Sequence, residues 1–168
     1  SRLLGLKKDI LLGVPLQEIL SFISRAGLAW SSAENTRRRL YVRQLISHLG
    51  YSQSMAELEA DMIAVVLRSG ARHSDAVHLE LGNRYILDDW VRQDECYVRA
   101  FPVGRVLHLV PGNVPIAAVT LIVRGLLTKN LNIVKLSAAD IFTATALAQS
   151  FVDLDPQHPV TRACNVVY

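Results

Sequence analysis

The chain has 168 residues, and 51% of them are hydrophobic, so a substantial core is expected and intrinsic disorder is excluded. A net charge of +3 with no concentrated basic region argues against a nucleic-acid partner. Two widely spaced cysteines form neither a disulfide framework nor a metal-ligand pair, which favours a reducing, cytoplasmic setting and no bound metal.

The first part of the chain predicts a helical N-terminal region over residues 1–70. Apolar residues recur there at helix spacing after a proline, and two Ser-x-x-Glu stretches have the form of a capping box, with the serine as N-cap. Glycines follow the apolar patterns, where they can end helices. These signals are Pro15, the boxes Ser31–Glu34 and Ser54–Glu57, Gly50 and Gly70.

The next segment, residues 71–103, gives mixed signals. Residues 85–87 and 96–98 favour short strands, each beside an acidic turn. No helix is predicted in this segment.

From residue 104 the pattern changes to strand, helix, strand, helix, strand. Apolar strands are expected near residues 106–110, 132–136 and 163–167, and helices over 116–127 and 138–152. Such strands are typical of a parallel sheet covered on both faces. The most apolar run, residues 114–127, is too short and too interrupted to span a bilayer. The fold prediction is therefore α/β, with a helical region followed by a parallel sheet.

Neither Gly-x-Gly-x-x-Gly nor a P-loop occurs, so a generic dinucleotide motif does not support this prediction. A different series of motifs does occur in the last third of the chain. The series is Pro-Val-Gly-Arg-Val at 102–106, Pro-Gly-Asn-Val-Pro at 111–115, Gly-Leu-Leu-Thr-Lys-Asn at 125–130, Asn-Ile-Val-Lys-Leu-Ser at 132–137 and Asn-Val-Val at 165–167. In order and spacing it resembles the nucleotide-binding domain of the aldehyde dehydrogenase superfamily, and within it the acyl-CoA reductase family that supplies aldehyde to bacterial luciferase.

That resemblance implies that residues 71–168 form part of a Rossmann-like nucleotide-binding domain. It further implies an enzyme that reduces long-chain fatty acyl-CoA to fatty aldehyde through a cysteine acyl-enzyme. It also implies acyl-transferring or synthetase subunits as partners, and a homo-oligomeric full-length protein. Two alternatives stay open: a superfamily member with another substrate, and a non-catalytic α/β binding or assembly module. A cysteine-bearing second domain in the coding sequence would favour the enzymes, whereas a native stop codon after Tyr168 would favour the module.

Asn113 is the candidate catalytic residue. It lies between two prolines where a strand is predicted to end, which is where parallel α/β sheets place functional groups. A side-chain amide held there can donate a hydrogen bond to an oxyanion, and the resemblance implies that role. The alternative is that Asn113 only caps the following helix, because asparagine is a favoured N-cap residue.

The resemblance places Pro111, Gly112, Lys135 and Ser137 at the cofactor. The chain departs from the family's Lys-Pro-Ser-Glu motif, because Leu136 replaces the proline and Ala138 replaces the glutamate. That glutamate chelates the ribose hydroxyls and would repel a 2′-phosphate. Its absence leaves Lys135 and Ser137 free to bind a phosphate, so we expect NADPH rather than NADH.

No cysteine occupies the position of the family's nucleophile. Cys164 falls inside a predicted strand and Cys96 precedes the nucleotide-binding part, so both are interpreted as ordinary core or surface residues. The chain begins with Ser1 and stops within a strand-like segment. We therefore expect an N-terminal fragment that is inactive by itself.

Overall fold

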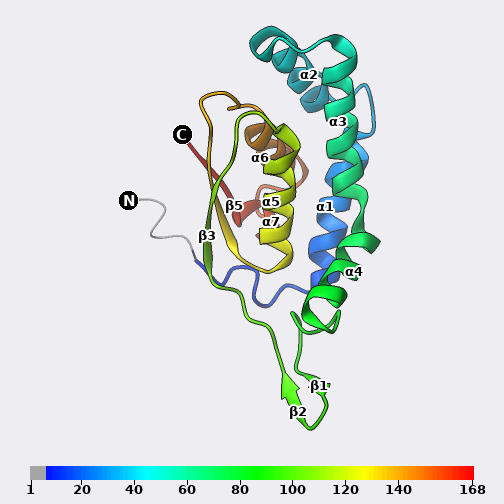
Figure 1. Ribbon diagram of the computed structural model, residues 1–168, viewed down its shortest axis with the longest axis vertical. Coiled ribbons are helices and arrows are strands. Elements are labelled where there is room, and N and C mark those ends of the chain that lie inside the picture. The colour runs from blue at the N-terminus through cyan, green and yellow to red at the C-terminus, as the bar shows by residue number, and fades with distance from the viewer. Residues whose placement is uncertain (1–6) are drawn as a thin grey trace.

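The structure, a computed structural model, describes residues 7–168, so the first six residues of the predicted helical region lie outside the described residues. A helical part is followed by a two-stranded hairpin and then by a three-stranded sheet with its helices (Figure 1). The elements are α1 (Leu16–Trp30), α2 (Thr36–Leu49), α3 (Gln53–Arg68), α4 (Gly70–Leu81), β1 (Val91–Gln93), β2 (Cys96–Val98), β3 (Arg105–Leu109), α5 (Pro115–Leu127), β4 (Leu131–Lys135), α6 (Thr143–Leu154), α7 (Pro159–Arg162) and β5 (Cys164–Val167). This order confirms the predicted α/β class. The division at residue 70 stays a prediction.

Two of the predicted helix boundaries are correct. Helix α1 begins directly after Pro15, whose missing N–H costs nothing at a helix start. Helix α2 ends at Gly50, which has a φ of 69° and adopts the left-handed conformation that glycine tolerates.

Both predicted capping boxes are wrong in position. Ser31 ends α1, and the side chain of Asn35 instead caps α2 by accepting a hydrogen bond from the backbone N–H of Arg38. Helix α3 is capped by Ser52, two residues before the predicted serine. Each turn offers more than one N-cap residue, serines and an asparagine at the first and two serines at the second. Local pattern alone does not decide which of them takes the cap.

Two further differences concern residues 69–98. Gly70 does not end the helical region, because α4 begins at it and continues to Leu81. Residues 85–87 form turns rather than a strand, whereas the strand expected at 96–98 is confirmed as β2. Only Val77 of α4 is buried, so the apolar periodicity that reveals a helix is almost missing there.

The three-stranded sheet is parallel, with strand order β3-β4-β5. Both crossovers step in the same direction, and because such connections are right-handed, α5 and α6 lie on the same side of the sheet (Figure 1). On the other side, Leu107 and Leu109 are 60% and 73% exposed. The expectation of a sheet covered on both faces is therefore wrong for residues 7–168, where helices cover one face only.

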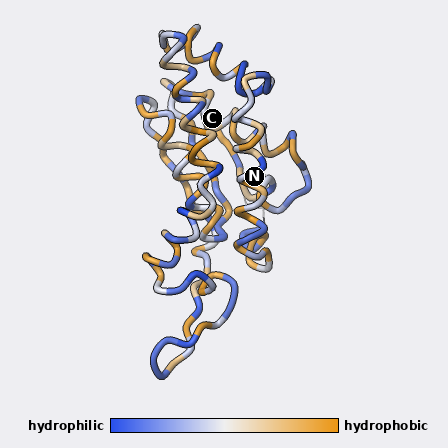
Figure 2. The backbone as a smooth tube through the Cα atoms, turned by 90° about the vertical axis from the view of Figure 1, so that its right-hand side faces the viewer, coloured by the Kyte–Doolittle hydropathy of each residue, from blue (hydrophilic) through white to orange (hydrophobic). Residues whose placement is uncertain are grey.

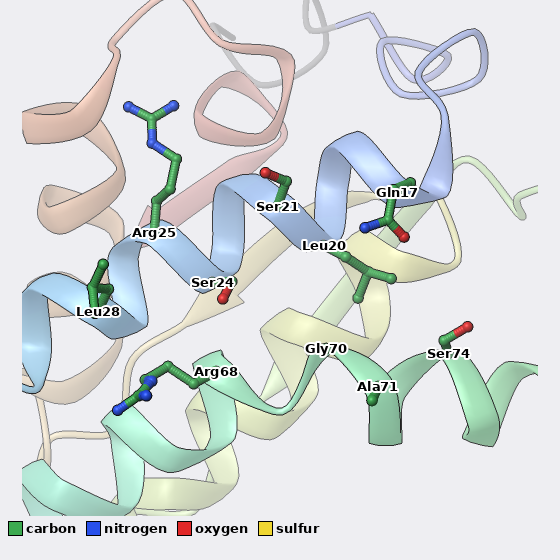
Figure 3. Close-up of a pocket in the computed structure, with 10 residues that line it drawn as sticks. All are labelled: Gln17, Leu20, Ser21, Ser24, Arg25, Leu28, Arg68, Gly70, Ala71 and Ser74. Carbon is green, nitrogen blue, oxygen red and sulfur yellow. The ribbon is translucent and has the colours of Figure 1, made fainter.

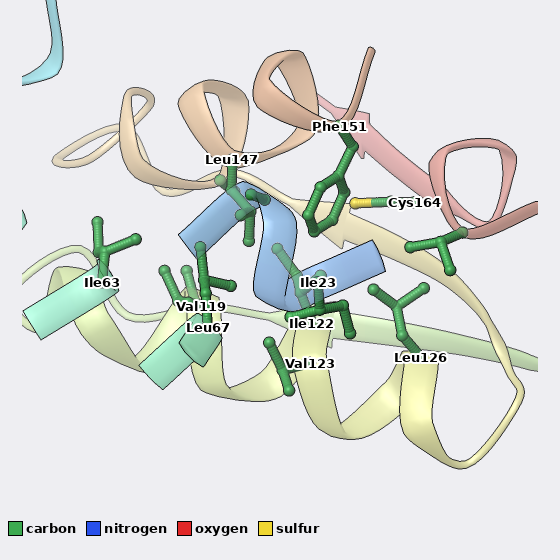
Figure 4. Packing of buried hydrophobic residues seen from close by; sticks show 14 of the residues in the cluster. Ile23, Ile63, Leu67, Val119, Ile122, Val123, Leu126, Leu147, Phe151 and Cys164 are labelled. Carbon is green, nitrogen blue, oxygen red and sulfur yellow. The ribbon is translucent and has the colours of Figure 1, made fainter. Parts of the chain in front are cut away.

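The core joins the helical part to the covered face of the sheet (Figure 4). Helix α5 lies between them and buries residues on several sides, including Val119, Ile122 and Leu126. Hydrophobic and hydrophilic stretches alternate along the tube of the helices, as Figure 2 shows. Across the described part of the chain, no helix combines the length and hydrophobicity needed to cross a bilayer.

A buried ion pair ties the turn before β4 to the start of α1. Lys129, 2% exposed at its side chain, donates to the carboxylate of Asp88 over 2.6 Å. The same carboxylate accepts the backbone N–H of Leu16, and the lysine also reaches the carbonyl of Leu12. Three segments far apart in sequence therefore meet at one lysine.

Replacing this lysine, Lys129→Met, is expected to lower the free energy of unfolding by about 3 kcal/mol, because the remaining carboxylate is left without its cation. The value is at the low end for a buried pair, since Asp88 is 29% exposed and keeps its bond to Leu16. Urea denaturation measures the change. The exposed Lys7, changed to methionine, is the control and should alter stability by less than about 0.5 kcal/mol. Equal effects at the two lysines would contradict the prediction.

Candidate functional site

Two loops meet at the carboxyl edge of the sheet, one after β3 (residues 110–114) and one after β4 (residues 136–142). Their contact is made at Gly112. A Cβ built on this glycine would lie 2.4 Å from Ser137 Oγ and 2.5 Å from the Cβ of Ala139, closer than real side chains approach. Only a residue without a side chain permits this approach. The structure therefore brings together two of the predicted site segments, 111–113 and 135–137.

Asn113 lies on the first of these loops, and its side chain is exposed. The N-cap residue of α5 is Val114, and no side chain caps that helix. The interpretation of Asn113 as a helix cap therefore finds no support in the geometry. Pro111 precedes it on the same turn and is also exposed.

Lys135 ends β4 and is exposed at the same edge of the sheet. Its ammonium donates to the carbonyl of Leu136 over 2.9 Å and lies over the ring of Tyr168. Ser137, two residues on, accepts a hydrogen bond from the backbone N–H of Ala139, which leaves its hydroxyl proton available to a ligand. A cation and a hydroxyl donor at one strand end form a suitable pair for an anionic group.

Asp140 is a site residue that sequence reasoning missed. It is 5% exposed, and its Oδ1 accepts the backbone N–H groups of Phe142 and Thr143, both over 3.0 Å, at the start of α6. The hydroxyl of Thr143 in turn shares a buried hydrogen bond with Tyr41 of α2. Burial raises the pKa of Tyr41, so this hydroxyl stays protonated. The second loop is thus fastened to the helical part.

A second carboxylate, Glu59 of α3, faces the same region. Burial and the negative charge of Asp140 raise the pKa of Glu59, and the Oε2 atom of Glu59 is buried with no hydrogen-bond partner among the described residues. The Asp-x-Phe-Thr spacing, which lets Asp140 accept the N–H groups of Phe142 and Thr143, could have been found in the sequence. The electrostatic effect of Asp140 on Glu59 could not.

Neither cysteine is placed to act as a nucleophile at this edge. Cys164 begins β5, is buried, and its burial raises the pKa of its thiol to about 12, so it is not ionised near neutral pH. Cys96 is exposed on the hairpin. Within residues 7–168, no group of three or more His, Cys, Asp or Glu side chains is arranged to hold a metal ion.

A further cavity lies away from this edge. It occupies about 680 Å³ between α1 and the segment joining α3 to α4, and no predicted site residue lines it (Figure 3). Ser24 of α1 and Arg68 of α3 are among the residues that line it. A cavity of about 430 Å³ adjoins the second loop and is lined by Leu136, residues 141–142 and Tyr168 together with α2 and α6.

Comparison with known proteins adds the following findings. Residues 11–168 match the sequence model of the family described as acyl-CoA reductase (LuxC). The chain is 51% identical over 160 residues to the long-chain acyl-protein thioester reductase of Vibrio harveyi, covering 95% of this chain and 34% of the relative. It is 50% identical over 153 residues to that of Photorhabdus luminescens (91% and 32%) and 45% over 168 residues to that of Aliivibrio fischeri (100% and 35%). The chain spans about a third of the length of these curated relatives.

Proposed function

The chain belongs to the acyl-CoA reductase (LuxC) family, and we propose that it is the N-terminal part of an NADPH-dependent reductase that converts long-chain fatty acyl thioesters to fatty aldehydes. The predicted resemblance is thereby confirmed at the level of the family. The relatives bear the name of acyl-protein thioester reductases, so an acylated protein is a proposed substrate beside fatty acyl-CoA.

One observation carries the proposal: Gly112 brings the turn bearing Asn113 against the loop bearing Ser137. The two loops follow neighbouring parallel strands, where open α/β sheets bind their ligands. The turn with the proposed oxyanion donor and the loop with a proposed cofactor-binding residue therefore touch at one edge of the sheet.

Asn113 has the simplest role in the proposed mechanism. Its exposed amide would donate a hydrogen bond to the oxygen of the thioester carbonyl as negative charge develops on it. Because the turn is held between Pro111 and Pro115, the donor is oriented before the substrate arrives.

Lys135 and Ser137 fit the 2′-phosphate of NADPH. The bound cofactor would supply the hydride. Lys135 would pair with a 2′-phosphate, and the free proton of the Ser137 hydroxyl would donate to it. The acid that follows, Asp140, points inward to α6 and presents no repelling carboxylate. This arrangement favours NADPH over NADH.

The nucleophile has to come from another source. The thiol of Cys164 is buried and Cys96 lies on the distant hairpin, so neither can attack a thioester at the carboxyl edge. We propose that the nucleophilic cysteine belongs to a part of the full-length protein beyond this chain. A cytoplasmic homo-oligomer with acyl-transferring or synthetase partners remains part of the same proposal.

The test is an assay of the protein encoded by the complete reading frame, with acyl-CoAs of graded chain length and an acylated protein, and with either NADPH or NADH. We expect aldehyde to form from long-chain thioesters and NADPH to bind more tightly. If the protein binds neither cofactor and forms no aldehyde, the proposed reductase function is refuted and a non-catalytic module is favoured.

The cofactor preference is tested separately with Lys135→Met. Loss of a hydrogen bond between charged groups costs about 1.5–3 kcal/mol, so the dissociation constant for NADPH should rise roughly 10- to 100-fold. The constant for NADH should change much less, because it has no 2′-phosphate. Lys7→Met, remote from this edge, is the control in the same titrations. An equal loss for both cofactors would contradict a contact between Lys135 and the 2′-phosphate.

A further inference from the structure

The loop after β4 is held in place by Asp140 from within. The backbone N–H of Asp140 donates to the carbonyl of Ser137 and closes a turn. The side-chain oxygen Oδ1 of Asp140 accepts the backbone N–H groups of Phe142 and Thr143 at the start of α6. Ser137 and Ala139, on either side of this turn, are the two residues that touch Gly112. The position of the Asp140 turn therefore determines the surface that Gly112 meets.

We propose that Asp140 is a positioning residue that sets the location of Asn113 through the contact between Gly112 and the Ser137 turn. This inference rests on the proposed function of Asn113 and Ser137. The cofactor-binding loop and the oxyanion donor then move as one unit, fastened through Thr143 and Tyr41 to the helical part. Asp140 touches no reacting atom.

The chain offers a matched pair of variants. Both hydrogen bonds of Asp140 go to the same oxygen, Oδ1, so Asp140→Asn keeps an acceptor for both N–H groups and removes only the charge. Asp140→Ala removes the acceptor as well. In the full-length enzyme we expect Asp140→Ala to lower kcat at least about tenfold and to weaken NADPH binding, while Asp140→Asn restores both.

The opposite side of the contact is tested with Gly112→Ala. Ordinary contact begins near 3.4 Å, and the new Cβ would lie 2.4 Å from Ser137 Oγ, so the loops must separate by roughly 1 Å. A misplacement of this size can reduce turnover by about 100-fold. Thermal melting shows which variants fold. If Asp140→Ala does not fold, Gly112→Ala replaces it in the double-mutant cycle and in the hydrogen-exchange comparison.

A double-mutant cycle separates positioning from general damage. If Asp140 acts through Asn113, the effect of Asp140→Ala on kcat should largely vanish in an Asn113→Ala background. Effects that simply multiply, or an Asp140→Asn variant as impaired as Asp140→Ala, would overturn the proposal.

Amide hydrogen exchange tests the contact without turnover. Residues 110–117 should exchange faster in Asp140→Ala than in Asp140→Asn if the loops are coupled. Should the wild-type enzyme reduce no thioester, this difference would still support the coupling while the proposed function failed. Identical exchange in the two variants would overturn the coupling whatever the activity.

Discussion

Asn113→Ala is expected to lower kcat for thioester reduction by about 10²- to 10³-fold in the full-length enzyme. That range corresponds to the loss of one preorganised donor to a developing oxyanion, about 3–4 kcal/mol of barrier. The dissociation constant for NADPH should not change, because Asn113 is not among the residues proposed to bind the cofactor. Single-turnover reduction of a long-chain thioester measures the rate, and equilibrium titration measures binding.

The control for this prediction lies on the same turn. Val114→Ala shortens an exposed side chain beside Asn113 and should leave kcat nearly unchanged. Because α5 has no side-chain cap, Asn113→Ala should also leave the melting temperature unchanged. A loss of about 1 kcal/mol in stability with normal turnover would show that Asn113 is a helix cap after all.

A large loss of stability is expected from Gly125→Ala in α5. A Cβ at this position would lie 1.8 Å from Oδ1 of Asn132, which accepts a hydrogen bond from Nε2 of His108 over 2.7 Å. Asn132 is fully buried on β4 and also donates to the carbonyl of Asn130. The methyl group must therefore displace a satisfied polar network rather than fill a gap.

Two penalties then add. Overpacking a filled core costs about 1–3 kcal/mol, and a buried polar group left without its partner costs about 1–3 kcal/mol more. The better helix propensity of alanine returns only about 1 kcal/mol. We therefore expect Gly125→Ala to lower the free energy of unfolding by about 3 kcal/mol in urea denaturation.

Gly70→Ala is the matched control, because Gly70 also lies in a helix and its Cβ would meet nothing within 4 Å. It should be neutral or slightly stabilising. If Gly125→Ala were as stable as Gly70→Ala, the close approach of α5 to β4 would be refuted.

The sequence predicts correctly those elements that have a local pattern of their own. The strands of the parallel sheet are short apolar runs, and α1 and α5 begin at prolines, so these were predictable. Helix α4 was missed because it buries a single residue, and α6 begins at Thr143 rather than 138 because Asp140 holds the preceding turn. These features depend on packing and on competing caps, which local pattern does not decide.

The candidate site was predictable for a different reason. Asn113, Lys135 and Ser137 stand out by position at strand ends and by motif. The structure places Lys135 at the end of β4 and the other two on loops that touch. The burial of Asp140 and the contact between Gly112 and Ser137 could not be predicted in the same way. The two loops that meet there lie about 25 residues apart in sequence. Only the fold determines such distances.

The uncovered face of the sheet has a practical consequence for anyone who handles this chain in solution. Leu107 and Leu109 present aliphatic surface to water in the folded state, and no described residue shields them. Dyes such as ANS fluoresce on exposed apolar surface and are commonly used to detect partly unfolded, molten states. Here the native chain itself would bind the dye, so fluorescence gain alone cannot report unfolding, and near-UV circular dichroism is the appropriate measure of native packing.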